Sequence, residues 1–127
     1  MAIAYRSKME KGLLIIIASG RDESVQQVIE YGASVIDLAL ATGATRVLCD
    51  ERDLEYALGT VDTFQAAQAI AERAPKIIRV AIVCGPKFLA LGKFWETVLV
   101  NRSLKVLVDT DMARARKWLA MDDFSWG

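Results

Sequence analysis

Short apolar runs of strand-like composition alternate with segments of helical periodicity along this chain of 127 residues, and no other feature constrains the fold as strongly. The apolar runs are too short for helices and rich in β-branched residues. We expect strands at residues 5–8, 13–18, 46–49, 77–84 and 104–108, the first two forming a hairpin. The resulting order, β-β-α-β-α-β-α-β-α, requires right-handed crossovers. It predicts an α/β fold with a mostly parallel sheet of about five strands, in one domain spanning residues 1–127.

Apolar residues in the intervening segments recur every three or four positions, which predicts helices over residues 25–40, 61–74, 88–99 and 112–119. We expect Asp22 to cap the first helix and Gly43 to end it. Thr60 is the expected cap of the second helix, and Pro86 suits the first position of the third.

Two of these helices carry further expectations about packing. Gly32 lies on the apolar face of the first helix, where we expect it to allow a close approach to the sheet. The core-facing side of the second helix is predicted to consist of its apolar residues, namely Val61, Phe64, Ala67, Ile70, Ala71 and Ala74.

The composition limits the classes of partner. Apolar residues make up 54% of the chain, enough for a dense core with some excess for an interface. Sixteen basic and sixteen acidic residues cancel, and no Lys/Arg run occurs, so we expect no nucleic-acid partner and no anionic membrane surface. The longest apolar stretch, 13–18, is far too short to span a membrane, and the first residues lack signal-peptide character. We therefore expect a cytoplasmic protein without a transmembrane segment.

The usual chemistry-bearing residues and motifs are missing. The chain has no histidine, no glycine-rich phosphate loop and no G-x-S-x-G elbow, so we predict no catalytic residue, metal or cofactor. Cys49 and Cys84 each end an apolar run, which indicates buried free thiols. A redox pair is the less favoured interpretation, because neither cysteine has an obvious activating cation.

A binding site is expected beyond the carboxyl ends of the parallel strands. The segment 50–59 carries a dense charge cluster there, which we interpret as a solvated loop. Asp50, Arg52 and Asp53 are its candidates for recognising a charged partner. Thr60 and Thr63 are candidate phosphate acceptors, although capping by Thr60 and a solvent-facing turn position for Thr63 are favoured.

Three stretches resemble a known family. Residues 79–83 read RVAIV, residues 89–94 read LALGKF, and residues 105–119 read KVLVDTDMARARKWL. Together with the opening hairpin, they make the chain resemble the SpoIIAA-like group of STAS-type domains from about residue 5 to residue 119. The resemblance implies a βα superhelix with strands in or near sequential order and helices largely on one face.

The resemblance also implies a function. The better-known relatives, the anti-sigma-factor antagonists, bind a partner protein and are switched off by phosphorylation. Their phosphorylated serine lies in an Asp-Ser-Ser-Gly-like turn that opens the helix after the third strand. The matching region here, 50–63, lacks that motif, and residues 59–63 offer threonines in roughly the same place.

We therefore predict a non-enzymatic regulatory or protein-interaction module whose partner docks around residues 50–64. The alternative is a carrier or sensor of a small apolar ligand or lipid, with a pocket near Phe88 and Trp95. An enzyme using Asp50 and Asp109 with Lys87 ranks last, because no spacing requires it.

The last residues bear on assembly. Phe124 and Trp126 lie in a tail that cannot extend the last helix. Because exposed aromatic side chains reduce solubility, the tail is expected to fold back onto the domain or to pack against a second subunit. Together with the apolar excess, it modestly favours a homodimer.

Overall fold

The computed structural model describes residues 2–121, and its elements follow the order predicted from the sequence. The strands are β1 (Ala4–Glu10), β2 (Leu13–Asp22), β3 (Arg46–Tyr56), β4 (Arg79–Cys84) and β5 (Lys105–Asp109). The helices are α1 (Val25–Thr42), α2 (Thr60–Arg73), α3 (Leu89–Val100) and α4 (Met112–Leu119), with a 3₁₀ helix η1 (Pro86–Phe88) before α3. The tail with Phe124 and Trp126 lies outside the described residues.

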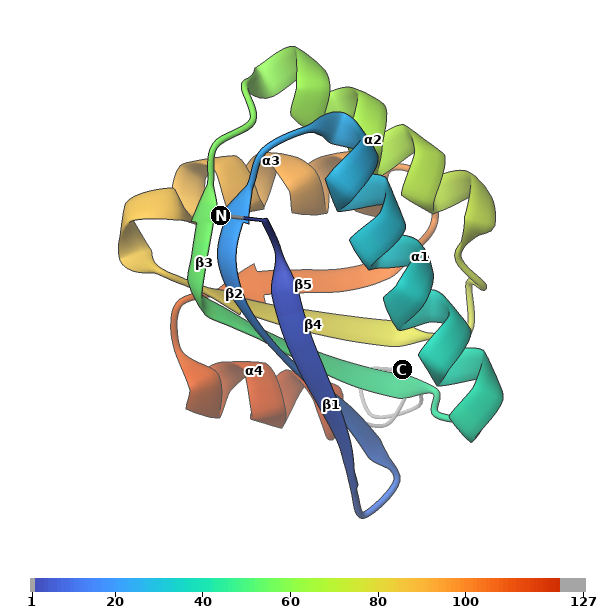
Figure 1. The fold of residues 1–127 in the computed structure, drawn as a ribbon. Coiled ribbons are helices and arrows are strands. Elements are labelled where there is room, and N and C mark those ends of the chain that lie inside the picture. Colours follow the sequence, from blue (N-terminus) through green and yellow to red (C-terminus); the bar gives the residue numbers. More distant parts are fainter. Residues whose placement is uncertain (1, 122–127) are drawn as a thin grey trace.

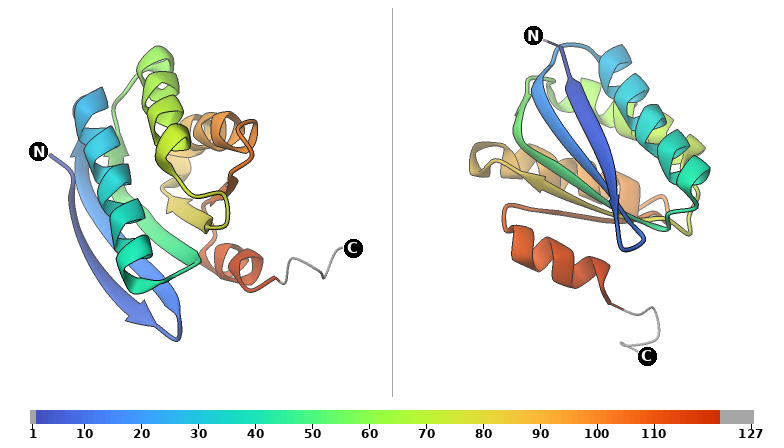
Figure 2. Two further views of the ribbon diagram at one scale, coloured as in Figure 1. Left: turned by 90° about the vertical axis from the view of Figure 1, so that its right-hand side faces the viewer. Right: turned by 60° about the horizontal axis from the view of Figure 1, so that its bottom comes forward.

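Within residues 2–121 the strands form a five-stranded sheet in the sequential order β1-β2-β3-β4-β5. β1 is antiparallel to β2, and β2 to β5 run parallel to one another. Figures 1 and 2 show α1, α2 and α3 on one face of the sheet and α4 on the other. The predicted α/β fold, with a mostly parallel sheet and helices largely on one face, is confirmed; the antiparallel β1 makes the sheet mixed.

Alternating side chains of the strands fill an apolar layer on each face of the sheet. Leu14 and Ile16 of β2 pack beneath α1, α2 and α3, whereas Ile15 packs beneath α4 with Ala115 and Leu119. Because both faces are covered, the strand is apolar without interruption over this stretch. Across residues 2–121, no helix has the length and apolar character that crossing a bilayer requires.

The charged segment predicted as a solvated loop is instead the second half of β3. This strand runs to Tyr56, pairs with β2 from Arg46 to Tyr56 with one irregularity after Asp50, and pairs with β4 as far as Glu51. Arg52 and Asp53 are exposed, whereas Glu51 and Leu54 are buried. Except for the buried Glu51, the charge cluster therefore marks the solvent side of a strand. The prediction of a loop was wrong because a half-exposed strand can carry several charges on one face.

The predicted start signals of the first two helices are displaced by one or two residues. Ser24 caps α1 with its side chain, whereas Asp22 is the last residue of β2. Gly59 is the N-cap of α2, so Thr60 is its first helical residue. Gly43 ends α1 in the left-handed conformation, at φ 72°, as predicted.

Two predicted packing faces are also corrected. Gly32 allows a close approach, but to α2 rather than to the sheet, because a Cβ at this position would collide with the Ile70 side chain. The buried face of α2 includes Thr63, which is 5% exposed, whereas Val61 is 70% exposed and Phe64 is also exposed. Small side chains, not the large apolar ones at its start, bring α2 close to its neighbours.

Candidate functional site

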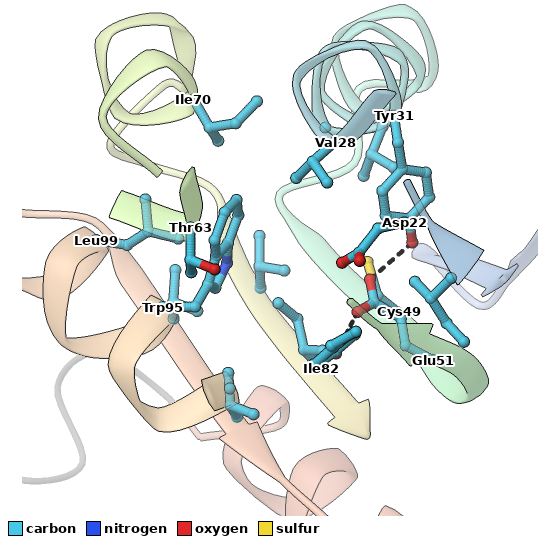
Figure 3. Close-up of a pocket in the computed structure, with 18 of the residues that line it drawn as sticks. Asp22, Val28, Tyr31, Cys49, Glu51, Thr63, Ile70, Ile82, Trp95 and Leu99 are labelled. Carbon is cyan, nitrogen blue, oxygen red and sulfur yellow. Dashed lines mark hydrogen bonds between the residues drawn. The ribbon is translucent and has the colours of Figure 1, made fainter. Parts of the chain in front are cut away.

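A cavity of about 140 Å³ lies between the sheet and the helices α1, α2 and α3. Helices α1, α2 and α3 and strands β3, β4 and β5 contribute apolar side chains, including Val28, Val35, Ile70, Ile82, Trp95 and Leu99. Figure 3 shows Ile70, Trp95 and Leu99 on one side of the space, and Val28 with a group of polar side chains on the other.

A bulge in β3 builds the polar end of this cavity. Ile17 pairs with Asp50 and Ser19 pairs with Asp53, so β3 holds one more residue than β2 over this interval. The residues of β3 that line the cavity accordingly step from Cys49 and Glu51 to Leu54 and Tyr56. If the same residues of β3 alternated strictly, with no bulge, Leu54 and Tyr56 would face the opposite side of the sheet.

Glu51 is the centre of the polar end. It is 6% exposed, and its carboxylate accepts hydrogen bonds from the Tyr31 hydroxyl at 2.8 Å and from the Tyr56 hydroxyl at 2.5 Å. Burial raises the pKa of Glu51, and the two tyrosine hydrogen bonds oppose that shift. Burial, and then the charge of Glu51, raise the pKa of both tyrosines well above its ordinary value, so they stay protonated as donors.

Asp22 is the second buried carboxylate, at 8% exposure. Its Oδ1 accepts the backbone N–H groups of Ala57 and Leu58, the latter at 3.2 Å, and so ties the segment after β3 to the end of β2. Burial raises the pKa of Asp22, while these two hydrogen bonds oppose the shift. In Figure 3 Asp22, Glu51, Cys49 and Tyr31 form one group at the edge of the cavity.

The sequence-predicted pocket residues separate in the structure. Trp95 lines the cavity, whereas Phe88 is not among the lining residues and packs its ring on Tyr56, with the centroids 5.5 Å apart. Thr63 also lines the cavity, so its expected solvent-facing position is wrong. Thr60 is exposed at the start of α2. Whether any of these residues binds a ligand or a phosphate stays a prediction.

The predicted partner-binding charges lie outside the cavity. Arg52 donates to both carboxylate oxygens of the half-buried Asp50, at 2.9 and 2.8 Å, and these hydrogen bonds lower the pKa of Asp50. Asp53 follows on the exposed side of β3. The structure therefore brings Asp50 and Arg52 together as a local ion pair, separate from Thr63 and Trp95.

The carboxylates of the enzyme interpretation are held in the ionised form. Arg114 donates to both oxygens of Asp109, at 3.0 and 2.9 Å, and holds the pKa of Asp109 well below its ordinary value. Arg52 acts similarly on Asp50. Neither carboxylate has the raised pKa that a proton donor needs. Among residues 2–121 no cluster of three or more potential ligand side chains is placed to hold a metal ion.

Both cysteines are free and buried. Burial raises the pKa of the Cys49 thiol well above its ordinary value and also raises that of Cys84. Their strands are neighbours, but Cys84 is paired in register with Glu51 rather than with Cys49. Since thiol reactivity depends on the thiolate, these shifts do not favour a redox pair.

Sequence reasoning missed the site role of the four polar residues Asp22, Tyr31, Glu51 and Tyr56, although local signals pointed to two of them. Glu51 continues the two-residue alternation of the buried residues Val47 and Cys49. Tyr31 lies three positions after Val28, on the apolar face of α1. The positions of Asp22 and Tyr56 depend on the length of β3 and its bulge, which no local pattern indicated.

No protein-family model matches the chain, and no curated protein matches it. Two similar solved structures each match 94% of its length. An anti-sigma factor antagonist from Mycobacterium paratuberculosis gives a TM-score of 0.61 with 16% identity, over 96% of that chain. An uncharacterised DUF3478-family protein with a SpoIIAA-like fold, from Shewanella loihica PV-4, gives 0.54 with 19% identity, over 94% of that chain. At these identities the likeness shows the fold, and the expected SpoIIAA-like fold is confirmed.

Proposed function

We propose that this chain is a non-enzymatic regulatory module of the STAS type whose input is a small, mainly apolar molecule bound in the cavity. One observation carries the proposal, namely about 140 Å³ of space between the sheet and the helices that cover it. Protein interiors are close-packed, because unfilled volume forfeits dispersion contacts. An apolar cavity of roughly 150 Å³ is large enough to bind benzene.

Two further observations support the regulatory, non-enzymatic part of the proposal. Asp50 and Asp109, the carboxylates at the strand ends, are each neutralised by an arginine. The fold is shared with a protein described as an anti-sigma factor antagonist. The cytoplasmic location and the homodimer stay predictions.

The proposal is tested by filling the cavity. Val28 lines it and is labelled in Figure 3, so Val28→Phe should occupy the space of the ligand. The matched control is Val100→Phe at the exposed end of α3. Toluene at about ten times its dissociation constant should stabilise the unmodified chain and the control by roughly 1.4 kcal/mol, and Val28→Phe hardly at all. Equal stabilisation of both variants, or none of the unmodified chain, would contradict the proposal.

A protein partner is the second candidate, favoured by an exposed apolar surface at the start of α2. Val61 is 70% exposed, Phe64 is also exposed, and the candidate phosphate acceptor Thr60 lies beside them. Because a helix N-terminus favours negative charge, phosphorylation of Thr60 would be stabilised there. This surface would bind an anti-sigma factor, the partner class suggested by the name of the similar protein.

The partner proposal is tested with Val61→Asp and the matched control Ile77→Asp. Ile77 is equally exposed, at 69%, but lies after the other end of α2. Binding is titrated against the anti-sigma factors of the source organism. Loss of binding in Val61→Asp with retention in Ile77→Asp supports this surface. Binding that survives both substitutions rules the surface out.

A further inference from the structure

The polar end of the cavity carries two acidic side chains, and no cation is among the described residues that line it. Among the described residues that line it are the carboxylates of Asp22 and Glu51, and no lysine or arginine. Both carboxylates are more than nine-tenths buried. Ionising a buried carboxyl group is costly unless a cation is near it, so a positively charged occupant would stabilise the ionised form of both groups.

Asp22 has an unused hydrogen-bonding atom. Its Oδ1 accepts both backbone N–H groups of the segment after β3, whereas Oδ2 accepts no hydrogen bond from residues 2–121. Figure 3 shows the Asp22 carboxyl group pointing into the space between Val28 and Thr63. A donor group of a ligand in the cavity can therefore reach an acceptor that the protein does not use.

The arginines that neighbour Asp22 and Glu51 in the sequence are engaged outside the cavity. Arg21, the neighbour of Asp22, is exposed and pairs with Glu55 at 3.2 Å. Arg52 is bonded to Asp50 on the exposed side of β3. Neither arginine is among the residues that line the cavity.

We propose that the cavity takes a small apolar amine, about the size of a single ring with a short arm, whose ammonium group lies at Asp22 and Glu51. This inference rests on the proposed ligand-binding function and names the class of ligand. The rings of Tyr31 and Tyr56 line the same end, and aromatic faces add attraction for a cation. A carboxylate ligand such as a fatty acid would place a third acidic group beside two buried ones. The cavity therefore excludes that class.

Three probes of similar shape separate charge from apolar fit. Benzylamine, toluene and benzoate are titrated against the full chain at neutral pH, where the first is a cation and the last an anion. We expect benzylamine to bind on the order of tenfold more tightly than toluene, and benzoate most weakly, because hydrogen bonds to charged groups stabilise a complex the most.

Two conservative variants assign that preference to the carboxylates. Asp22→Asn keeps an oxygen that can accept the same backbone N–H groups, and Glu51→Gln keeps the shape of its side chain. Each should weaken benzylamine on the order of tenfold and leave toluene unchanged. Asp53→Asn, which removes an exposed carboxylate of the same strand, should change neither.

The outcomes distinguish the inference from the function on which it rests. If toluene or benzoate binds as tightly as benzylamine, the amine class is wrong and the cavity remains a ligand site. If benzylamine binds equally well to Asp22→Asn, Glu51→Gln and Asp53→Asn, the carboxylates do not recognise it and the inference is also wrong. If none of the three probes binds, both the inference and the proposed function fail.

Discussion

Replacing Tyr31 by phenylalanine removes one hydroxyl group and keeps the ring, so it isolates one hydrogen bond of the buried cluster. The lost donor lies 2.8 Å from Oε2 of Glu51, a side chain that is 6% exposed. A hydrogen bond to a charged group contributes about 1.5–3 kcal/mol. We expect Tyr31→Phe to lower the free energy of unfolding by this amount at pH 8. In a domain of this size, each kcal/mol lowers Tm by roughly 3–6 °C.

The pH dependence of this loss has a definite sign. Burial raises the pKa of Glu51 in the folded state above its ordinary value of 4.5, and the Tyr31 hydrogen bond opposes the rise. Without that bond, the pKa rises further. Because the folded chain then binds the Glu51 proton more tightly than the unfolded chain does, the free energy of unfolding falls as the pH rises from 4.5 through the folded-state pKa. Because this fall is larger in Tyr31→Phe, the difference from the unmodified chain should shrink as the pH is lowered toward 4.5.

The assay is urea unfolding at several pH values between 8 and 4.5, with Tyr5→Phe as the control. The ring of Tyr5 meets that of Tyr31 edge-on, with the ring centroids 5.6 Å apart, and Tyr5 is exposed. Loss of its hydroxyl group should therefore change the free energy of unfolding by less than about 0.5 kcal/mol. Equal losses in the two variants at pH 8 would refute the reasoning. So would a loss in Tyr31→Phe that does not change with pH.

Two other substitutions test the packing and the surface charges. A Cβ at Gly92 would lie 2.7 Å from Cγ1 of Val108. Gly92→Ala should therefore lower the free energy of unfolding in urea by about 1–2 kcal/mol, although alanine has the better helix propensity. A variant more stable than the unmodified chain would contradict this. Arg114 holds the pKa of Asp109 below its ordinary value of 3.8. Asp109→Asn should therefore lower Tm at pH 7, and the difference in Tm from the unmodified chain should shrink as the pH falls below 3.8. A difference in Tm that persists in acid would exclude the ion pair as its cause.

The elements of this fold follow from local patterns. The helix predicted over 25–40 is α1, Val25–Thr42, and the one predicted over 112–119 is α4 within the same bounds. These segments have a regular apolar period and clear end signals, such as Gly43. The sequential strand order came from the family resemblance, and the parallel pairing from the alternation of strands and helices.

The candidate site could be predicted only in part. Trp95 was identified because its helix carries large apolar residues, and it lines the cavity. The hydrogen bond between Tyr31 and Glu51 joins residues 20 positions apart, and its formation depends on how α1 sits over β3. The charged residues around Glu51 predict a loop, whereas its side chain is buried in the structure. Contacts of this kind are set by tertiary packing, which a local pattern does not contain.

The bulge in β3 also determines where the chain can change length. Cavity-facing residues step from Glu51 to Leu54, with Arg52 and Asp53 both exposed between them. Deleting either exposed residue leaves a strictly alternating strand in which Leu54 and Tyr56 still face inward. Deleting a residue between Arg46 and Glu51 turns part of the buried strand outward instead. Among distant relatives with this cavity, single-residue gaps should therefore collect at the bulge, and an alignment that places them elsewhere in β3 would misassign the lining.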